Sequence, residues 1–213
     1  MLILDTLNKT TIWGGTRLQK FGSDPLEPHV GSLYTVAGNG ELSCMVLNGE
    51  YIGLTLYDVY RDNREMFGYD KYEPFPLLIG LVDATADLSI QIHPGDEYAR
   101  AHENAPFGKT ESWLFLEAPV SGSIVNGCKC QSRQELNERV AAGDWDNVID
   151  RLPVQKGEYV FVPTGTLHAL CAGSLVYEIQ QSTDVTYRFY DYDRTDKDGN
   201  KRPLQLDKAM ENI

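Results

Sequence analysis

The second half of the chain consists of short apolar segments separated by turn residues, and this pattern constrains the fold more than any other feature. Residues 158–163, 167–173, 174–181 and 185–193 each have the length and the β-branched and aromatic content of a strand. Residues 75–84, 88–94 and 111–118 have the same character. So many short strands without intervening long helices predict a mainly β fold, a sandwich or closed barrel rather than a βαβ sheet.

A few helices are expected as insertions in this β structure. Residues 131–152 are the clearest helical stretch, because Ser132 and Glu135 have capping-box spacing. Residues 55–68 form a second candidate, with Thr55 and Asp58 at the same spacing and Gly68 as a stop. Residues 96–104 predict a short helix. Residues 29–56 predict short antiparallel strands joined by Gly-Asn and Asn-Gly turns. The polar tail, residues 194–213, is expected to end in a short helix.

Charge and composition exclude several classes of partner. The chain of 213 residues has 19 Lys and Arg against 31 Asp and Glu, a net charge of −12. This balance disfavours a nucleic-acid or anionic membrane surface, so neither partner is expected. The four cysteines form no C-x-x-C pair and are expected to be free thiols. No signal peptide or membrane segment is recognised, and a cytoplasmic location is expected. A homo-oligomer is left open.

Two histidines, a glutamate and a glutamine indicate a metal site. Gln91 and His93 share one face of a strand whose other face carries Ile90 and Ile92, because strand side chains alternate with period two. Glu111 opens a later strand, and His168 follows a Pro-x-Gly turn. Two imidazoles with a carboxylate and an amide oxygen would bind a divalent metal such as zinc, iron, manganese or nickel.

The turn before His168 adds a second signal. In GEYVFVPTGTLHAL, Gly157, Pro163, Gly165 and His168 have a spacing that resembles the second cupin motif, in which the turn directs a metal-binding histidine into a jelly-roll barrel. The asparagine usual in that motif is replaced by Ala172. The resemblance implies a cupin-type jelly-roll barrel with a few inserted helices.

Longer motifs make the resemblance more specific. LSIQIHPGDEYA, FGKTESW, VPTGTLHAL and LVYEIQQSTDVTYRFYDYDR, together with IWGGTRL and LLIGLVDA, resemble the short bacterial type I phosphomannose isomerases over nearly the whole chain. The resemblance implies interconversion of mannose 6-phosphate and fructose 6-phosphate, one zinc ion per chain and a small sugar phosphate as partner, with other divalent metals left open. The metal ligands it implies are Gln91, His93, Glu111 and His168.

The resemblance also implies roles for three basic residues. Arg188 matches the family's active-site arginine, Arg194 a further basic position that binds substrate, and Lys109 the lysine two residues before the metal-binding glutamate. Aldose–ketose isomerisation moves a proton between C1 and C2 through an enediol. Arg188 could hold an enediolate oxygen or the phosphate through its planar fork. Lys109 could act as an acid, with its pKa lowered by the nearby metal cation.

Three departures from the family pattern support an alternative. Gly80 stands where similar members have a lysine, and Ser32 and Tyr34 stand in place of the residues of a G-E-x-W segment. Family members usually continue into a second β domain, so residues 1–213 are expected to form a single domain without it. The alternative is a catalytically impaired metal cupin that binds a sugar or sugar phosphate. A different metal chemistry, such as that of an iron oxygenase, is also open.

Overall fold

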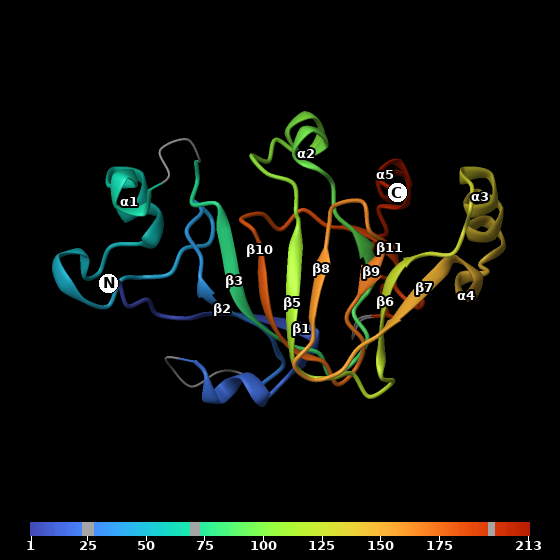
Figure 1. Ribbon diagram of the computed structural model, residues 1–213, viewed down its shortest axis with the longest axis horizontal. Helices are drawn as coiled ribbons and strands as arrows, with labels where there is room; N and C mark the ends of the chain where they lie inside the picture. Colours follow the sequence, from blue (N-terminus) through green and yellow to red (C-terminus); the bar gives the residue numbers. More distant parts are fainter. Residues whose placement is uncertain (23–27, 69–72, 196–198) are drawn as a thin grey trace.

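The computed structural model describes residues 1–22, 28–68, 73–195 and 199–213, and it is dominated by two antiparallel β-sheets (Figure 1). The six-stranded sheet has the order β1-β2-β3-β10-β5-β8, and the five-stranded sheet has the order β11-β4-β9-β6-β7. Neighbouring strands are mostly distant in the sequence, as in a jelly roll. The expected mainly β, cupin-type architecture with inserted helices is confirmed.

The strands of the six-stranded sheet are β1 (Leu7–Gly15), β2 (Val30–Val36), β3 (Leu77–Asp83), β10 (Leu175–Gln181), β5 (Glu111–Glu117) and β8 (Tyr159–Val162). Those of the five-stranded sheet are β11 (Tyr187–Tyr190), β4 (Ile90–Ile92), β9 (His168–Ala169), β6 (Ser123–Cys128) and β7 (Ile149–Pro153). The helices are α1 (Leu56–Asp62), α2 (Asp96–His102), α3 (Arg133–Ala142), α4 (Trp145–Val148) and α5 (Leu206–Glu211). Three 3₁₀ turns are η1 (Arg17–Lys20), η2 (Gly49–Tyr51) and η3 (Arg64–Phe67).

Alternating side chains place the core between the two sheets. In β5, Trp113 and Phe115 are buried while Leu114 is exposed, and in β8 Val160 and Val162 are buried. These inward residues pack with Ile124 of the five-stranded sheet in one apolar cluster. The period-two alternation expected of half-buried strands therefore produces the core.

The helices lie at the margins of the sheets. Figure 1 shows α1 at one end of the molecule and α3 and α4 at the other. Leu136 of α3, Val148 of α4 and Ala209 of α5 pack in a second apolar cluster with Ile92 and Phe189 of the five-stranded sheet. No helix among the described residues has the length and hydrophobicity needed to cross a membrane. The four cysteines are free thiols.

Three expectations of local structure need correction. The helix expected over 55–68 is divided: α1 ends at Asp62, because Asn63 has a non-helical backbone, and a 3₁₀ turn continues to Gly68, the expected stop. The helix expected over 131–152 stops at Gly143, which has a left-handed backbone, and its last residues instead form β7 against β6. Of the strands expected over 29–56, only β2 forms a ladder, and isolated bridges follow it.

Candidate metal centre and its cavity

Three buried side chains meet between the sheets at the ends of their strands. His93 directly follows β4, Glu111 is the first residue of β5, and His168 is the first residue of β9. Their exposed fractions are 1%, 2% and 0%. His93 Nε2 lies 3.4 Å from Glu111 Oε2, and His168 Nε2 lies 3.3 Å from Glu111 Oε1. Donor atoms of all three lie within 4.8 Å of one another, close enough to share one metal ion.

The other ring nitrogens fix the orientation of both imidazoles. His93 Nδ1 lies 2.9 Å from the Val185 carbonyl oxygen, and His168 Nδ1 lies 2.8 Å from that of Thr166. A carbonyl can only accept, so each Nδ1 carries the proton and each Nε2 presents a lone pair. Both Nε2 atoms are buried without a hydrogen-bond partner, and the Glu111 carboxylate beside them is buried as well. Two lone pairs and a carboxylate oxygen converging in this way fit a divalent metal, and the carbonyls supply the usual outer support.

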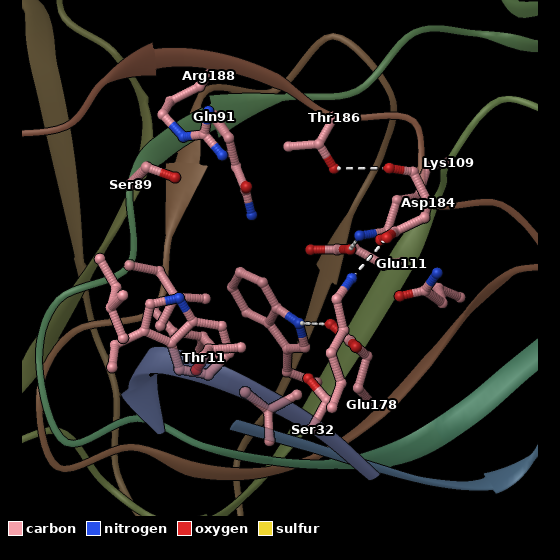
Figure 2. A pocket seen from close by; sticks show the side chains of 18 of the residues that line it. Thr11, Ser32, Ser89, Gln91, Lys109, Glu111, Glu178, Asp184, Thr186 and Arg188 are labelled. Carbon is pink, nitrogen blue, oxygen red and sulfur yellow. Dashed lines mark hydrogen bonds and ion pairs between the residues drawn. The ribbon is translucent and has the colours of Figure 1, made fainter. Parts of the chain in front are cut away.

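The fourth expected ligand, Gln91, lies beside this group. It pairs with His168 on one side and with Arg188 on the other, in adjacent strands. Figure 2 shows its amide pointing into the cavity below Arg188. Its amide oxygen is a suitable ligand for the same ion. The structure thus brings all four expected residues to one region.

Charges around Glu111 set its protonation. Burial alone would raise the pKa of Glu111, but Lys109 and the two imidazoles hold it well below its usual range. Lys109 Nζ lies 3.2 Å from Glu111 Oε2, and both side chains are buried. Burial lowers the pKa of Lys109, yet Glu111, Glu178 and Asp184 together raise it above its ordinary value. The lowered pKa expected for Lys109 refers to the metal-loaded site, where the cation would act against these three carboxylates.

A cavity of about 530 Å³ opens from this group, a size suited to a small ligand. Lys109, Glu111, Gln91 and Arg188 all line it. Arg188 Nη1 donates to the Pro203 carbonyl at 2.7 Å, while Arg188 Nε is buried without a partner. Burial, followed by the charges of Arg202 and Arg194, lowers the pKa of Arg188. Its guanidinium therefore lies in a positive environment beside Gln91.

Arg194 is not part of the cavity wall. Its guanidinium donates to the Asp191 carboxylate and to the Asp87 carbonyl. Arg202, which the sequence did not single out, lines the cavity instead.

The chain is similar to known proteins in both sequence and structure. Residues 1–110 match the model of the family "Phosphomannose isomerase type I, catalytic domain". The chain is 42% identical to the probable mannose-6-phosphate isomerase GmuF of Bacillus subtilis, over 100% of this chain and 68% of that protein. It belongs to the type I phosphomannose isomerase family. The enzyme class expected from the sequence is thereby confirmed.

Solved structures of mannose 6-phosphate isomerases are also similar to this chain. The crystal structure of the Bacillus subtilis mannose 6-phosphate isomerase has a TM-score of 0.93 and 39% identity, over 99% of this chain and 68% of that one. A zinc-bound mannose 6-phosphate isomerase has a TM-score of 0.74 at 14% identity, over 100% and 74% of the two chains, which shows a shared fold. The chain spans about two thirds of the length of its similar relatives.

The departures from the phosphomannose isomerase pattern lie side by side on β2 and β3. Tyr34 is directly opposite Gly80, and Ser32 is opposite Val82. A Cβ at Gly80 would lie 2.6 Å from the Leu33 carbonyl oxygen and 3.1 Å from the Tyr34 Cα. Because β2 approaches so closely, this backbone has no room for a side chain at position 80.

Sequence reasoning missed Glu178, which lines the cavity on β10. It stands opposite Gly80 on one side and Trp113 on the other, and Trp113 Nε1 donates to Glu178 Oε1 at 2.9 Å. Burial, followed by the charge of Glu111, raises its pKa to about 7. A signal was available, because Glu178 falls between Val176 and Gln180 on the inward face of an apolar strand.

A second missed group lies at another part of the wall. Lys9 of β1 and Asp184 both line the cavity and form an ion pair of 2.6 Å. Their sequence contexts carry no signal, because each is an exposed charged residue in a polar stretch.

Proposed function

We propose that this chain is a metal-dependent isomerase that interconverts mannose 6-phosphate and fructose 6-phosphate, with one zinc ion per chain. One observation carries the proposal. Two imidazole nitrogens, both buried and without hydrogen-bond partners, converge with a buried carboxylate at a cavity that is also lined by basic side chains. The names of the similar relatives supply the substrate.

Zinc would be held by His93, Glu111 and His168, with Gln91 as a fourth ligand. Two nitrogen donors with a carboxylate are a common zinc set, and a solved mannose 6-phosphate isomerase of this fold is described as zinc-bound. When bound, the ion would polarise the oxygens on C1 and C2 and stabilise negative charge between them. The buried imidazoles hold their lone pairs in place before any metal binds, which reduces the cost of ordering the site.

The protein's own residues would handle the proton. The reaction removes a proton from one of C1 and C2 and returns one to the other, without gain or loss of atoms. Glu178 has a pKa near 7, so its carboxyl can both accept and donate a proton near neutrality. Lys109 remains a cation among three carboxylates, where it can donate a hydrogen bond to a substrate oxygen.

Arg188 would bind the substrate. Its Nε has no partner among the described residues, and the guanidinium lies across from Gln91 in the neighbouring strand. A planar fork in this place suits an enediolate or phosphate oxygen. Arg194 is engaged by Asp191 and Asp87, so its role would be to support this region rather than to contact the sugar. The two sheets share one core, which supports treating residues 1–213 as a single cupin-type unit.

Gly80 favours one other function, a metal cupin that binds a sugar phosphate without converting it. In that case the same cavity binds the ligand, but no group completes the proton transfer.

A coupled assay for fructose 6-phosphate formed from mannose 6-phosphate separates the two functions. Zinc-loaded protein, with its metal content determined in parallel, should turn over. Both a chelator and the Arg188→Ala substitution should abolish the activity. A fully metallated protein without turnover that still binds mannose 6-phosphate would overturn the isomerase and support the binding protein.

A further inference from the structure

The polar tail folds back onto the site instead of leaving it. Gln205 donates its backbone N–H to the Arg188 carbonyl at 2.9 Å, and its side-chain oxygen accepts from the Arg188 N–H at 3.0 Å. The Pro203 carbonyl accepts from Arg188 Nη1. This segment therefore runs beside β11 and adds two residues, Arg202 and Gln205, to the cavity wall.

Arg202 is held in a defined orientation by a buried carboxylate. Its Nε lies 2.8 Å from Asp191 Oδ2 and its Nη2 lies 2.5 Å from Asp191 Oδ1, a two-point contact. Asp191 is 4% exposed and also accepts from Arg194. Such a fork has little freedom left, so the remaining N–H groups of Arg202 keep a fixed direction. Within the described part of the chain, Arg202 Nη1 has no hydrogen-bond partner, and Arg202 lines the cavity.

The charges in this corner do not balance. Arg194 and Arg202 both pair with the carboxylate of Asp191, and Arg188 lies close enough for their charges to lower its pKa, although the chain has a net charge of −12. Arg188 has no carboxylate ion pair among the described residues, and Arg202 and Arg194 help to lower its pKa. A structural ion pair would need only one arginine for Asp191. The two guanidinium groups on the cavity wall, those of Arg188 and Arg202, instead suit a dianion with several oxygens.

We propose that Arg202, oriented by Asp191, binds the phosphate group of the sugar phosphate together with Arg188. The substrate class rests on the proposed function above, whereas the anion site rests on the guanidinium groups themselves. Arg202 contacts the phosphate directly, and Asp191 is a positioning residue that acts through Arg202. The segment after β11 is therefore part of the substrate-binding surface, and it supplies a contact that the metal ligands cannot provide.

The test compares Arg202→Gln with Lys201→Gln in the zinc-loaded protein. Lys201 is adjacent in sequence, pairs with the exposed Asp193 and does not line the cavity. Lys201→Gln therefore removes one positive charge, as Arg202→Gln does, but from outside the site. Arg202→Gln should raise the KM for mannose 6-phosphate about ten- to hundredfold, the value of a charged hydrogen-bonded contact. Its kcat should stay within about twofold, because binding is lost far from the reacting carbons. Lys201→Gln should leave both constants unchanged.

Arg202→Lys keeps the charge and loses the fork, so its KM should fall between wild type and Arg202→Gln. If circular dichroism shows that Arg202→Gln does not fold, Arg202→Lys takes its place in the comparison with Lys201→Gln. A KM for Arg202→Gln or Arg202→Lys equal to that of Lys201→Gln would overturn the assignment.

A binding measurement separates this inference from the proposed function. Phosphorus NMR titration of inorganic phosphate and of mannose 6-phosphate does not require turnover. If the wild type is inactive but Arg202→Gln binds both probes more weakly than Lys201→Gln, the isomerase function fails and the phosphate site stands. Equal affinity of the two variants for both probes overturns the phosphate site, whether or not the wild type is active.

Discussion

The imidazole rings of His93 and His168 lie 4.7 Å apart between centroids and are tilted by 46° to each other. Each ring is anchored through Nδ1 to a backbone carbonyl, so the two Nε2 lone pairs are directed at the same small volume. Neither ring packs as an ordinary core residue, because each leaves a buried nitrogen without a partner. The two unpartnered nitrogens lower the stability of the metal-free protein, and binding of an ion restores that stability.

Replacing His168 with alanine should therefore lower the zinc content sharply, because one of the converging donors is lost. The strands around it should persist, since the apolar cluster that contains Phe115, Val160 and Val162 remains in place when the imidazole is removed. Elemental analysis after dialysis measures the metal, and circular dichroism measures the fold. His102→Ala, at the exposed end of α2, is the matched control and should keep its metal. Full zinc content in the His168 variant would contradict the site.

The metal-free protein should lose stability as the pH falls from about 7 to about 5. Burial, followed by the charge of Lys109, lowers the pKa of His93 to about 3, whereas an unfolded histidine titrates near 6.5. Below about pH 6.5 the unfolded chain binds a proton at His93 that the folded chain does not bind. The free energy of unfolding therefore falls by up to about 1.4 kcal/mol for each unit by which the pH is lowered. Urea unfolding after treatment with a chelator measures this slope.

His93→Gln should flatten that dependence, since the group that resists protonation is gone. If the two proteins had the same slope over this range, the stability loss would arise elsewhere.

Adding a side chain at position 80 should lower the stability of the protein. In Gly80→Ala the new Cβ would meet the Leu33 carbonyl at 2.6 Å, a backbone atom that cannot move aside cheaply. We expect a loss of about 1–3 kcal/mol in the free energy of unfolding, typical of overpacking. Gly40→Ala is the control, because its Cβ would meet only the Tyr57 ring at 3.9 Å. Equal unfolding midpoints for the two variants would contradict the close approach of β2 and β3.

Glu178→Gln should lower kcat about 10²- to 10⁴-fold, the usual value of a general acid or base. The amide can still accept from Trp113 Nε1, so the fold and the zinc content should not change. Steady-state kinetics and metal analysis on the same preparation measure both effects. Glu138→Gln, on the exposed face of α3, removes a carboxylate outside the cavity and should be neutral. A Glu178 variant that retains a kcat within a few-fold of wild type would remove this residue from the proton path.

The strand pattern and the metal-binding candidates could be predicted from local sequence. Period-two alternation places Gln91 and His93 on one face, and the Pro-x-Gly turn places His168 at the start of a strand. These features depend on a few neighbouring residues, so they can be predicted before the fold is known. Helix ends were less predictable, because the backbone leaves the helical conformation at Asn63 and the pairing of β7 with β6 competes with helical propensity.

The sequence by itself determined the mainly β class, the inward faces of the strands and the chemistry of the metal donors, because all three follow from alternation and side-chain type. Only the tertiary structure decided which strands become neighbours. It placed Glu178 opposite Gly80, excluded a side chain at position 80, brought Arg202 from the tail to Asp191 and bound Arg194 to Asp191 and Asp87. Strand order in a jelly roll is set by long-range packing and loop closure, and no short stretch of sequence encodes such distant pairings.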